Sequence, residues 1–577
     1  MTTSTTPVNS ILDNPHQFSA PSWDEVQKIA RSTTSTKTQY FSFVVHEVFH
    51  GVNAISISGF EVREINGKFI DKSAWRIHSV SNELQSHPAS NLLDGNPETV
   101  WHTEEIAPAG HYVVIDMGKI YEIGSICYIP RQALKSSVNG RVKKYSLSIY
   151  TETSEWVSVK SGTFNPGRSP QDIVLSEGNE RRDFIFISRK HSHIDDMSDK
   201  GFSMARADFE CTGLYCISGQ QFYIYLENDV PAGVTLELLV GAMHLGENPA
   251  PSRFPIKQGE NTIIPDRDGL LFLYVIHPEK KYIIPVSFRN VLTAPYYVLG
   301  NTTKDQWASM LKNAAMITSA QLFSGKAMIA VSVSKAMEYM EEDIDQLLNE
   351  YNRIIDKADE ACGINESNYS DGGIHLPSDS YYQFNQSSSD RVYMAAASYS
   401  LLFHRDVVQV LLSPKVLTAE GGWGAWHELG HAYQLPKMNG YHTVESTCNI
   451  ISLAVEKMYG ITPSWIDRYD GRTQAKEWLK GTNKNFETAG NMVSLVMYNE
   501  LTELFGANFY PSVYQEYRRL LKDPSFIEDT ALPESRNDIF AFMASKCAKK
   551  NLISHFDSWG FMLQEKTKVK IRALGYP

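Results

Sequence analysis

The chain has 577 residues, of which 42% are hydrophobic and 21% charged, and its formal net charge is −12. A single core rarely serves more than about 300 residues, so we expect about two to four domains. The composition excludes global disorder, and an acidic surface repels phosphate backbones, which makes nucleic acid a poor candidate partner.

The first half of the chain is predicted to be rich in β-structure. Residues 1–36 are rich in Ser, Thr, Asn and Pro and predict an irregular leader with a short helix near Trp23–Ala30. Short segments rich in β-branched and aromatic residues follow, and their spacing is typical of β-sandwiches. The predicted strands are Tyr40–Val45, Ala54–Ser58, Tyr112–Ile115, Ile123–Ile129, Lys144–Tyr150, Asp183–Ile187, Phe222–Leu226, Thr235–Val240 and Leu270–Ile276.

From about Thr302 onward, apolar residues recur every three or four positions, which is the period of an amphipathic helix. The last part of the chain is therefore predicted to be mainly α-helical. The predicted helices are Ala336–Ala358, Val407–Leu412, Gly424–Gln434, Thr443–Tyr459, Glu487–Leu504 and Val513–Leu521.

No apolar stretch of the sequence approaches the roughly 20 residues that a bilayer-spanning helix needs, so no transmembrane segment is expected. The N-terminal Met1–Thr6 lacks the apolar core of a signal peptide. Either the chain stays inside the cell, or a signal was removed before this sequence begins. The six cysteines are scattered without Cys-x-x-Cys spacing, so free buried thiols are the simplest interpretation.

The pentad His427-Glu428-Leu429-Gly430-His431 carries the clearest chemical signal. Two histidines four residues apart on a helix lie one turn apart on the same face, where their imidazoles can bind one zinc ion. Glu428 lies beside these ligands, where it can take a proton from a metal-bound water. The simpler alternative is a helix with two solvated histidines.

The following residues predict a third ligand. Asn439-Gly440 ends the helix, and a second helix begins near Thr443 and carries Glu445. Helix, turn and helix fold this carboxylate back onto the histidines and leave a fourth position open for water, as catalytic zinc requires. Two alternatives stay open: Glu445 is a first-turn acid favoured by the helix dipole, or His442 is the third ligand.

Residues Gly421–Gln434 closely resemble the motif of the enhancin-like, mucin-degrading metallopeptidases, metallopeptidase family 60. Glu445–Ile450 resembles that family's Glu-Val-Thr-Asn-Asn-Ile segment, from which Ser446 and Cys448 depart. Two outer matches are Thr212–Tyr215, like the family's Thr-Gly-Leu-Tyr, and Trp559–Phe561, like its Trp-Gly-Phe. The resemblance covers about residues 210–577 and implies a gluzincin-type catalytic domain with zinc and glycoprotein substrates.

Residues 74–212 resemble a galactose-binding, discoidin-like module, carbohydrate-binding module family 32, which is a jelly-roll sandwich. The matching segments are Ala89–His102, Ile115–Gly118, Tyr128–Gln132, Asn139–Tyr145 and Glu152–Trp156. By position in that family, His102, Arg131 and Asn139 make the sugar pocket, and Arg and Asn supply the fixed polar groups that hydroxyls need. The alternative is that Arg131 and Asn139 are ordinary loop residues.

The loop Asp94–Thr99 resembles that family's structural calcium site. The implied ligands are Asp94, Asn96 and Thr99, with Glu210 as a distant ligand, and such oxygen-rich loops suit this hard ion. An Asp-Gly turn without an ion is the alternative.

We divide the chain into 1–73, a leader with an extra β segment; 74–212, the discoidin-like module; 213–300, a second β-rich domain; and 301–577, the helical catalytic domain. Residues 38–66 resemble the closing strands of a discoidin-like fold. They are either the end of a preceding domain or an extra sheet packed on the module.

These features together predict a zinc endopeptidase that cleaves O-glycosylated, mucin-type proteins and binds galactose or N-acetylgalactosamine termini. Such substrates are extracellular, so we expect secretion or display at the cell surface. Two alternatives stay open: a glycan-binding adhesin or scaffold with little activity, and a peptidase indifferent to glycans. The intact set of His427, Glu428, His431 and Glu445 favours an active enzyme.

Overall fold

The computed structural model describes residues 18–28, 36–49, 54–104, 110–132, 140–175, 182–189, 192–226, 228–241, 250–365, 368, 370–387, 389–397, 399–436, 440–523, 525 and 536–577. The chain forms two compact units. Unit 1 contains the described residues within 1–190, 209–241 and 250–310, and unit 2 contains the described residues within 192–208 and 311–577. No helix of the described residues is both long and apolar enough to cross a membrane.

The N-terminal part of unit 1 is built around one long strand, β5 (His111–Pro130). Its first half pairs with β1 (Lys37–Phe49), and its second half pairs with β2 (Ser56–Glu64). Between the halves lies Gly118, whose φ of +83° and close approach to the Ala74 Cβ suit only glycine. The remaining strands are β3 (Arg76–Val80), β4 (Trp101–His102), β6 (Arg141–Tyr150), β7 (Trp156–Thr163) and β8 (Gln171–Val174), and α1 (Trp23–Lys28) precedes β1.

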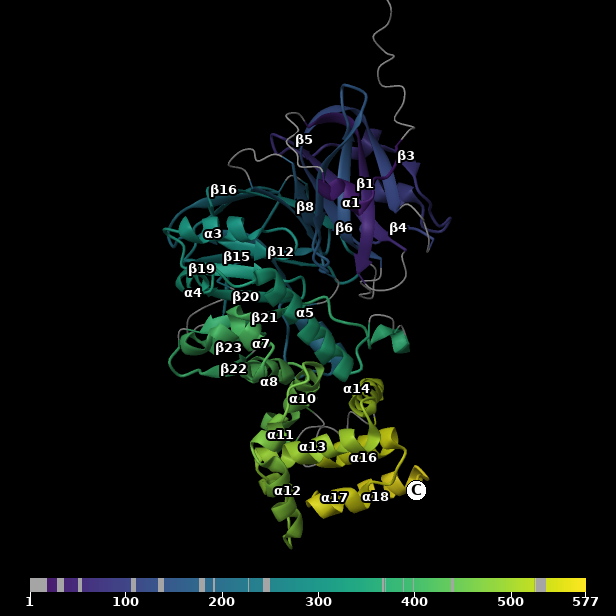
Figure 1. Cartoon of the computed structure of the whole chain (residues 1–577), viewed down its shortest axis with the longest axis vertical. Coiled ribbons are helices and arrows are strands. Elements are labelled where there is room, and N and C mark those ends of the chain that lie inside the picture. Colours follow the sequence, from purple (N-terminus) through teal and green to yellow (C-terminus); the bar gives the residue numbers. More distant parts are fainter. Residues whose placement is uncertain are drawn as a thin grey trace, which may run out of the picture. The chain divides into compact units, whose positions relative to one another are not determined.

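The two predicted strands Tyr112–Ile115 and Ile123–Ile129 are therefore one continuous strand. The segments within residues 38–66 are β1 and β2, and both strands belong to the same eight-stranded sheet as β5 (Figure 1). Aromatic rings fill the core of this module: Phe43, Phe60, Tyr128, Tyr145 and Phe164.

Unit 1 also contains two smaller sheets, of order β13-β12-β15-β10-β17 and β14-β11-β16-β9, around a separate apolar core. The sequence placed β9 and half of β10 in the 74–212 module, but their partners are strands of these two sheets. The bounds are β9 (Arg182–Ile187), β10 (Phe209–Cys216), β11 (Phe222–Leu226), β12 (Thr235–Val240), β13 (Ser252–Pro255), β14 (Gly259–Ile263), β15 (Gly269–Ile276), β16 (Ile283–Arg289) and β17 (Leu292–Thr293). The next strand along the chain, β18 (Tyr296–Val298), belongs to neither of these two sheets.

Unit 2 contains a mixed sheet that the helical pattern of the sequence did not predict. Its strands lie in the order β19-β20-β21-β23-β22, with bounds β19 (Ser319–Phe323), β20 (Ala327–Ser332), β21 (Tyr382–Ser387), β22 (Met394–Ala397) and β23 (Ser400–His404). β19 is buried throughout and β20 nearly so, so neither shows the alternation by which a half-exposed strand is found. The last strand of this order, β22, contacts α8 (Trp423–His431), the helix that carries the pentad His427–His431 and is called the motif helix below (Figure 1).

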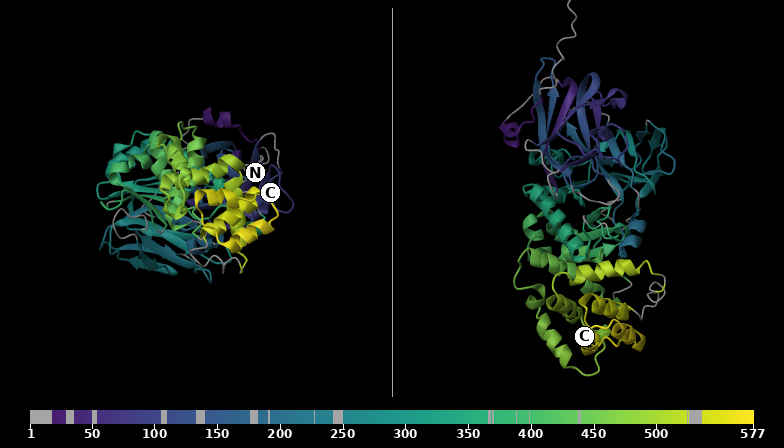
Figure 2. Two further views of the ribbon diagram at one scale, coloured as in Figure 1. Left: turned by 90° about the horizontal axis from the view of Figure 1, so that it is seen from below. Right: turned by 90° about the vertical axis from the view of Figure 1, so that its right-hand side faces the viewer.

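The helices follow the predicted segments with shifted ends. The predicted helix Ala336–Ala358 is two helices, α4 and α5, because Ser332 and Asp343 each cap a new helix start. Helices after α10, coloured yellow-green to yellow, gather away from the sheet of unit 2 (Figure 1, Figure 2). The bounds are α2 (His193–Lys200), α3 (Lys304–Lys312), α4 (Val333–Glu338), α5 (Ile344–Ala361), α6 (Gln409–Leu412), α7 (Pro414–Leu417), α8 (Trp423–His431), α9 (Val444–Thr447), α10 (Asn449–Met458), α11 (Trp465–Arg468), α12 (Gly471–Lys480), α13 (Asn491–Phe505), α14 (Phe509–Leu520), α16 (Arg536–Ala548), α17 (Ile553–Trp559) and α18 (Glu565–Ala573).

Candidate metal centre

The motif helix α8 packs unusually closely against the junction between α9 and α10. A Cβ atom added to Gly430 would lie 2.1 Å from the carbonyl oxygen of Cys448 and 3.1 Å from its Cα. Real Cβ atoms do not approach backbone so closely, so this packing requires glycine at position 430. The close approach brings Glu445 and Cys448 beside the two histidines of α8.

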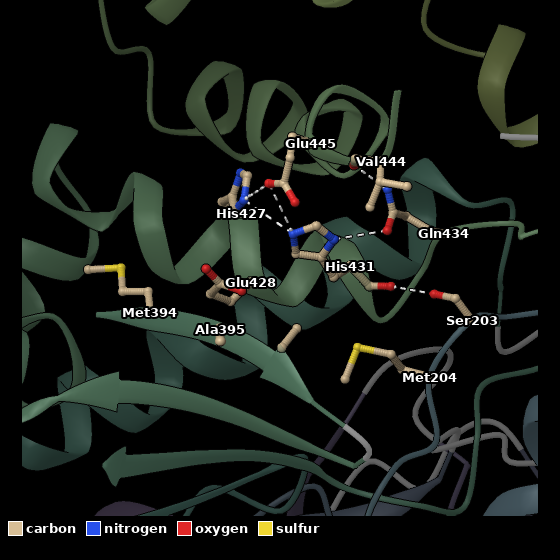
Figure 3. A pocket seen from close by; sticks show the side chains of 11 residues that line it. Ser203, Met204, Met394, Ala395, His427, Glu428, His431, Gln434, Val444 and Glu445 are labelled. Carbon is tan, nitrogen blue, oxygen red and sulfur yellow. Dashed lines mark hydrogen bonds and ion pairs between the residues drawn. The ribbon is translucent and has the colours of Figure 1, made fainter. Parts of the chain in front are cut away.

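Four side chains converge at this contact. Nε2 of His427 lies 3.2 Å from Nε2 of His431 and 3.1 Å from Oε2 of Glu445, while His431 Nε2 lies 3.6 Å from the same oxygen (Figure 3). With the Cys448 Sγ, these donor atoms all lie within 4.8 Å of one another. Among the described residues, this is the only such group of three or more His, Cys, Asp or Glu side chains.

Two amide side chains orient the imidazoles. His427 Nδ1 bonds to Oδ1 of Asn449 at 2.9 Å, and His431 Nδ1 bonds to Oε1 of Gln434 at 2.9 Å. Because an amide oxygen only accepts hydrogen bonds, each Nδ1 carries a proton, so in the neutral form that binds a metal ion each Nε2 directs its lone pair at the centre.

The amide nitrogens fix these orientations. Asn449 Nδ2 donates to the carbonyl oxygen of Glu445 at 2.9 Å. Gln434 Nε2 donates to the carbonyl oxygen of Val444 at 2.5 Å and to Oγ1 of Thr447 at 2.7 Å. The same two side chains therefore hold the α9–α10 region and set the tautomer of each histidine.

The electrostatics of the group favour a cation. Burial lowers the pKa of His427, but its bonds with Cys448 and Glu445 outweigh this and raise the pKa to about 11. The same effects raise the pKa of His431 to about 10, and bonds from both histidines hold the pKa of Glu445 far below its usual range. The anionic donors thus stabilise positive charge at this point, which a divalent ion would supply.

Glu428 lies beside this group and faces a pocket. Its side chain is 5% exposed, and burial raises the pKa of its carboxyl. The pocket has a volume of about 390 Å³, and three of the four donor residues line it: His427, His431 and Glu445. Ser203 and Met204 and the β22 residues 394–396 line its other sides (Figure 3).

Of the two rival third ligands, the structure brings Glu445 and not His442 to the histidines. His442 is exposed and lies outside the group, with its Nε2 3.7 Å from Oε2 of Glu487. The contribution of Cys448 was not foreseen, because a thiol is as common in an apolar core as at a metal. Gln434 and Asn449 lie within the segments that carry the family resemblance, which was the only sequence signal for them.

Two of the three residues predicted to form the sugar site, His102 and Arg131, lie in the part of the chain that the structure describes. His102 and Arg131 both reach Ser56 of β2: His102 Nδ1 lies 2.5 Å from its Oγ, and Arg131 Nη1 donates to that Oγ over 3.4 Å. Burial and the charge of Arg131 lower the pKa of His102, so this imidazole is neutral at pH 7. Asn139 lies outside the described residues. The sequence missed Ser56 because it precedes the segment that resembles the module.

The predicted calcium site has no support in the described residues and stays a prediction. Thr99 Oγ1 donates to Oδ2 of Asp94 at 2.7 Å, and the backbone N–H of Asn96 donates to Oδ1 of Asp94. Glu210 is bound elsewhere, by Arg189 at 2.6 Å and by Ser169 at 2.7 Å.

Comparisons with known proteins identify the class of both regions. Residues 290–560 match the family model of Peptidase M60, enhancin and enhancin-like, and residues 76–193 match the F5/8 type C domain. The chain therefore carries an enhancin-like M60 domain and a discoidin-like domain, as the two sequence resemblances indicated.

The curated relatives are similar to this chain in sequence, at low identity. A TRPM8 channel-associated factor homolog from Xenopus laevis is 26% identical over 317 residues, which cover 53% of this chain and 32% of that protein. The chain thus spans about a third of the length of this curated relative.

Among solved structures, a conserved protein of unknown function from Bacillus anthracis has a TM-score of 0.61 at 24% identity, over 68% of this chain and 79% of that one. The M60 catalytic domain of Clostridium perfringens ZmpC, in complex with the sialyl T antigen, has a TM-score of 0.56 at 14% identity, over the same shares.

We predict that Asn449→Ala weakens metal binding about 10- to 100-fold, because such partners of histidine ligands fix the ring and its tautomer. Competitive titration with a metal chelator measures this. The matched control is Asn349→Ala on α5, whose exposed amide makes the same bond to the carbonyl four residues earlier. Equal affinity of the two variants would contradict the orienting role of Asn449.

Proposed function

We propose that unit 2 is a zinc-dependent endopeptidase that cleaves O-glycosylated, mucin-type proteins. The observation that carries the proposal is the convergence of His427, His431 and Glu445 at a pocket that Glu428 also lines. Two neutral imidazoles and a carboxylate are the donor set of many catalytic zinc sites. A zinc ion bound there would make a water nucleophilic near neutral pH and polarise the scissile carbonyl.

Glu428 is suited to transfer the proton of the attacking water. Its carboxyl is buried beside the donors, and the raised pKa brings it closer to the working pH of a general base. In the proposed reaction it takes the proton of the attacking water and passes it to the nitrogen of the leaving amine. No tyrosine lines the pocket among the described residues, so the second group that stabilises the oxyanion is not assigned.

The edge strand β22 is suited to hold a peptide. The backbone N–H of His404 donates to the carbonyl of Tyr393, so this opposed pair is hydrogen-bonded. Bonded and non-bonded pairs alternate along an antiparallel ladder, so Met394 and Ala396 direct their backbone groups away from β23. A substrate can add to this free edge as an extended strand, with chain continuing on both sides of the cleaved bond.

Two observations support glycoprotein substrates. The similar ZmpC domain was solved with the sialyl T antigen, and another similar metallopeptidase was solved with the Tn antigen. The discoidin-like domain of this chain presents His102 and Arg131 around Ser56, which suits the hydroxyls of galactose or N-acetylgalactosamine. A weak sugar site on the same chain raises the effective concentration of a glycosylated polymer. Because such substrates are extracellular, the proposal includes secretion or surface display.

We predict that Glu428→Gln lowers the rate of cleavage by about two to four orders of magnitude, the usual effect of losing a general base. Metal content should not change, because Glu428 is not among the four donors. Cleavage assays with metal analysis measure both, and Glu477→Gln, at an exposed glutamate of α12, is the control. Activity of Glu428→Gln within about threefold of the unaltered protein, far short of that loss, would remove Glu428 from the mechanism.

We predict that removing O-glycans from a mucin-type protein slows its cleavage, and that mass spectrometry places the new termini beside glycosylated Ser or Thr. Cleavage that is unchanged or faster after deglycosylation would favour a peptidase indifferent to glycans.

Arg131→Ala should weaken galactoside binding about tenfold, the effect of losing one hydrogen bond to a charged group. Lys160→Ala, at an exposed position of β7, is the control.

A further inference from the structure

Cys448 lies on the closed side of the metal centre. Its side chain is fully buried, and it is not among the residues that line the pocket, whereas the other three donor residues are. Its Sγ lies 3.5 Å from Nδ1 and 3.9 Å from Nε2 of His427. The sulfur therefore lies on the side of the metal centre that faces away from the pocket, and it leaves the pocket side open.

The distances between the four donor atoms suit one zinc ion that all of them share. Zinc binds sulfur at about 2.3 Å and nitrogen or oxygen at about 2.0–2.2 Å, which places tetrahedral donors about 3.3–3.6 Å apart. Four of the six distances between the donor atoms are 3.1, 3.2, 3.6 and 3.9 Å, and all six lie within 4.8 Å. Shifts of about an ångström would bring all four atoms within zinc-binding distance of one ion.

The backbone of the chain fixes where the sulfur lies. The carbonyl of Cys448 packs against Gly430, and its neighbours Thr447 and Asn449 bond to Gln434 and His427. The two amides that orient the imidazoles thus also hold the cysteine between them. In the family segment that Glu445–Ile450 resembles, this position is Asn.

We propose that Cys448 is a fourth protein ligand of the metal ion, bound through its sulfur as a thiolate. The proposal rests on the metal centre of the proposed function. As the sulfur–metal bond forms, the thiol proton passes to solvent. The thiolate and the Glu445 carboxylate together neutralise a divalent ion, so the ion is held more tightly than by the histidines and glutamate alone. The pocket side, beside Glu428, would stay free of a fifth protein donor and open to the reacting water.

X-ray absorption at the zinc edge on the purified full chain tests this ligand directly. The expected spectrum contains one sulfur per zinc at about 2.3 Å, beside nitrogen and oxygen at about 2.0–2.2 Å. Cys448→Ser should lack the sulfur shell and bind zinc at least about tenfold more weakly, by analogy with losses of supporting groups. Cys547→Ser, at the half-buried cysteine of α16, is the control and should keep the shell.

Replacement of zinc by Co²⁺ gives a second readout, because a thiolate ligand adds a near-ultraviolet charge-transfer band that Cys448→Ser should lose. Bound zinc with only nitrogen and oxygen neighbours in the unaltered protein would overturn the proposal and leave the peptidase function standing. A sulfur shell that persists in Cys448→Ser would also overturn it. Failure of the unaltered protein to bind any metal would overturn both proposals. If Cys448→Ser does not fold, the spectrum of the unaltered protein alone decides.

Discussion

The candidate metal centre depends on one close contact between backbones, at Gly430 of α8 and Cys448 between α9 and α10. The helix period alone places His427 and His431 side by side, but it supplies no third donor. Because position 430 has no side chain, the α9–α10 junction can approach until Glu445 reaches both imidazoles. Any larger residue at position 430 would separate the donors as well as the helices.

The same side chains serve the fold and the site. Gln434 and Asn449 bridge the two helical segments and simultaneously fix the tautomers of His431 and His427. The anionic donors that raise the pKa of the histidines in the absence of an ion are those that would bind one. The centre is thus pre-organised on rigid helices, while the pocket in front of it is bounded by β22 and by residues 203 and 204.

The local pattern predicted much of this site. Spacing within α8 and the turn before Glu445 were enough to indicate the histidines, Glu428 and the third donor. The place of Cys448 could not be predicted, because it follows from packing across helices and not from periodicity. Ser56 was missed for a related reason: it reaches His102 from a strand that lies outside the segment resembling the module.

The fold, like the site, could be predicted from the sequence only in part. Strands with apolar and aromatic runs were found in unit 1, although β5 was divided in two where Gly118 interrupts its pattern. The sheet of unit 2 was missed because buried strands such as β19 have no alternation to distinguish them from helix. That sheet supplies the edge strand of the proposed peptide site, so the substrate-binding side of the pocket could not be derived from the sequence.

The most direct test of the account is anomalous diffraction at the zinc absorption edge, from crystals of the full chain grown with zinc. We expect one strong peak within ligand distance of Nε2 of His427, Nε2 of His431 and the carboxylate of Glu445. No peak at this position, or an ion held by His442 in place of Glu445, would contradict it.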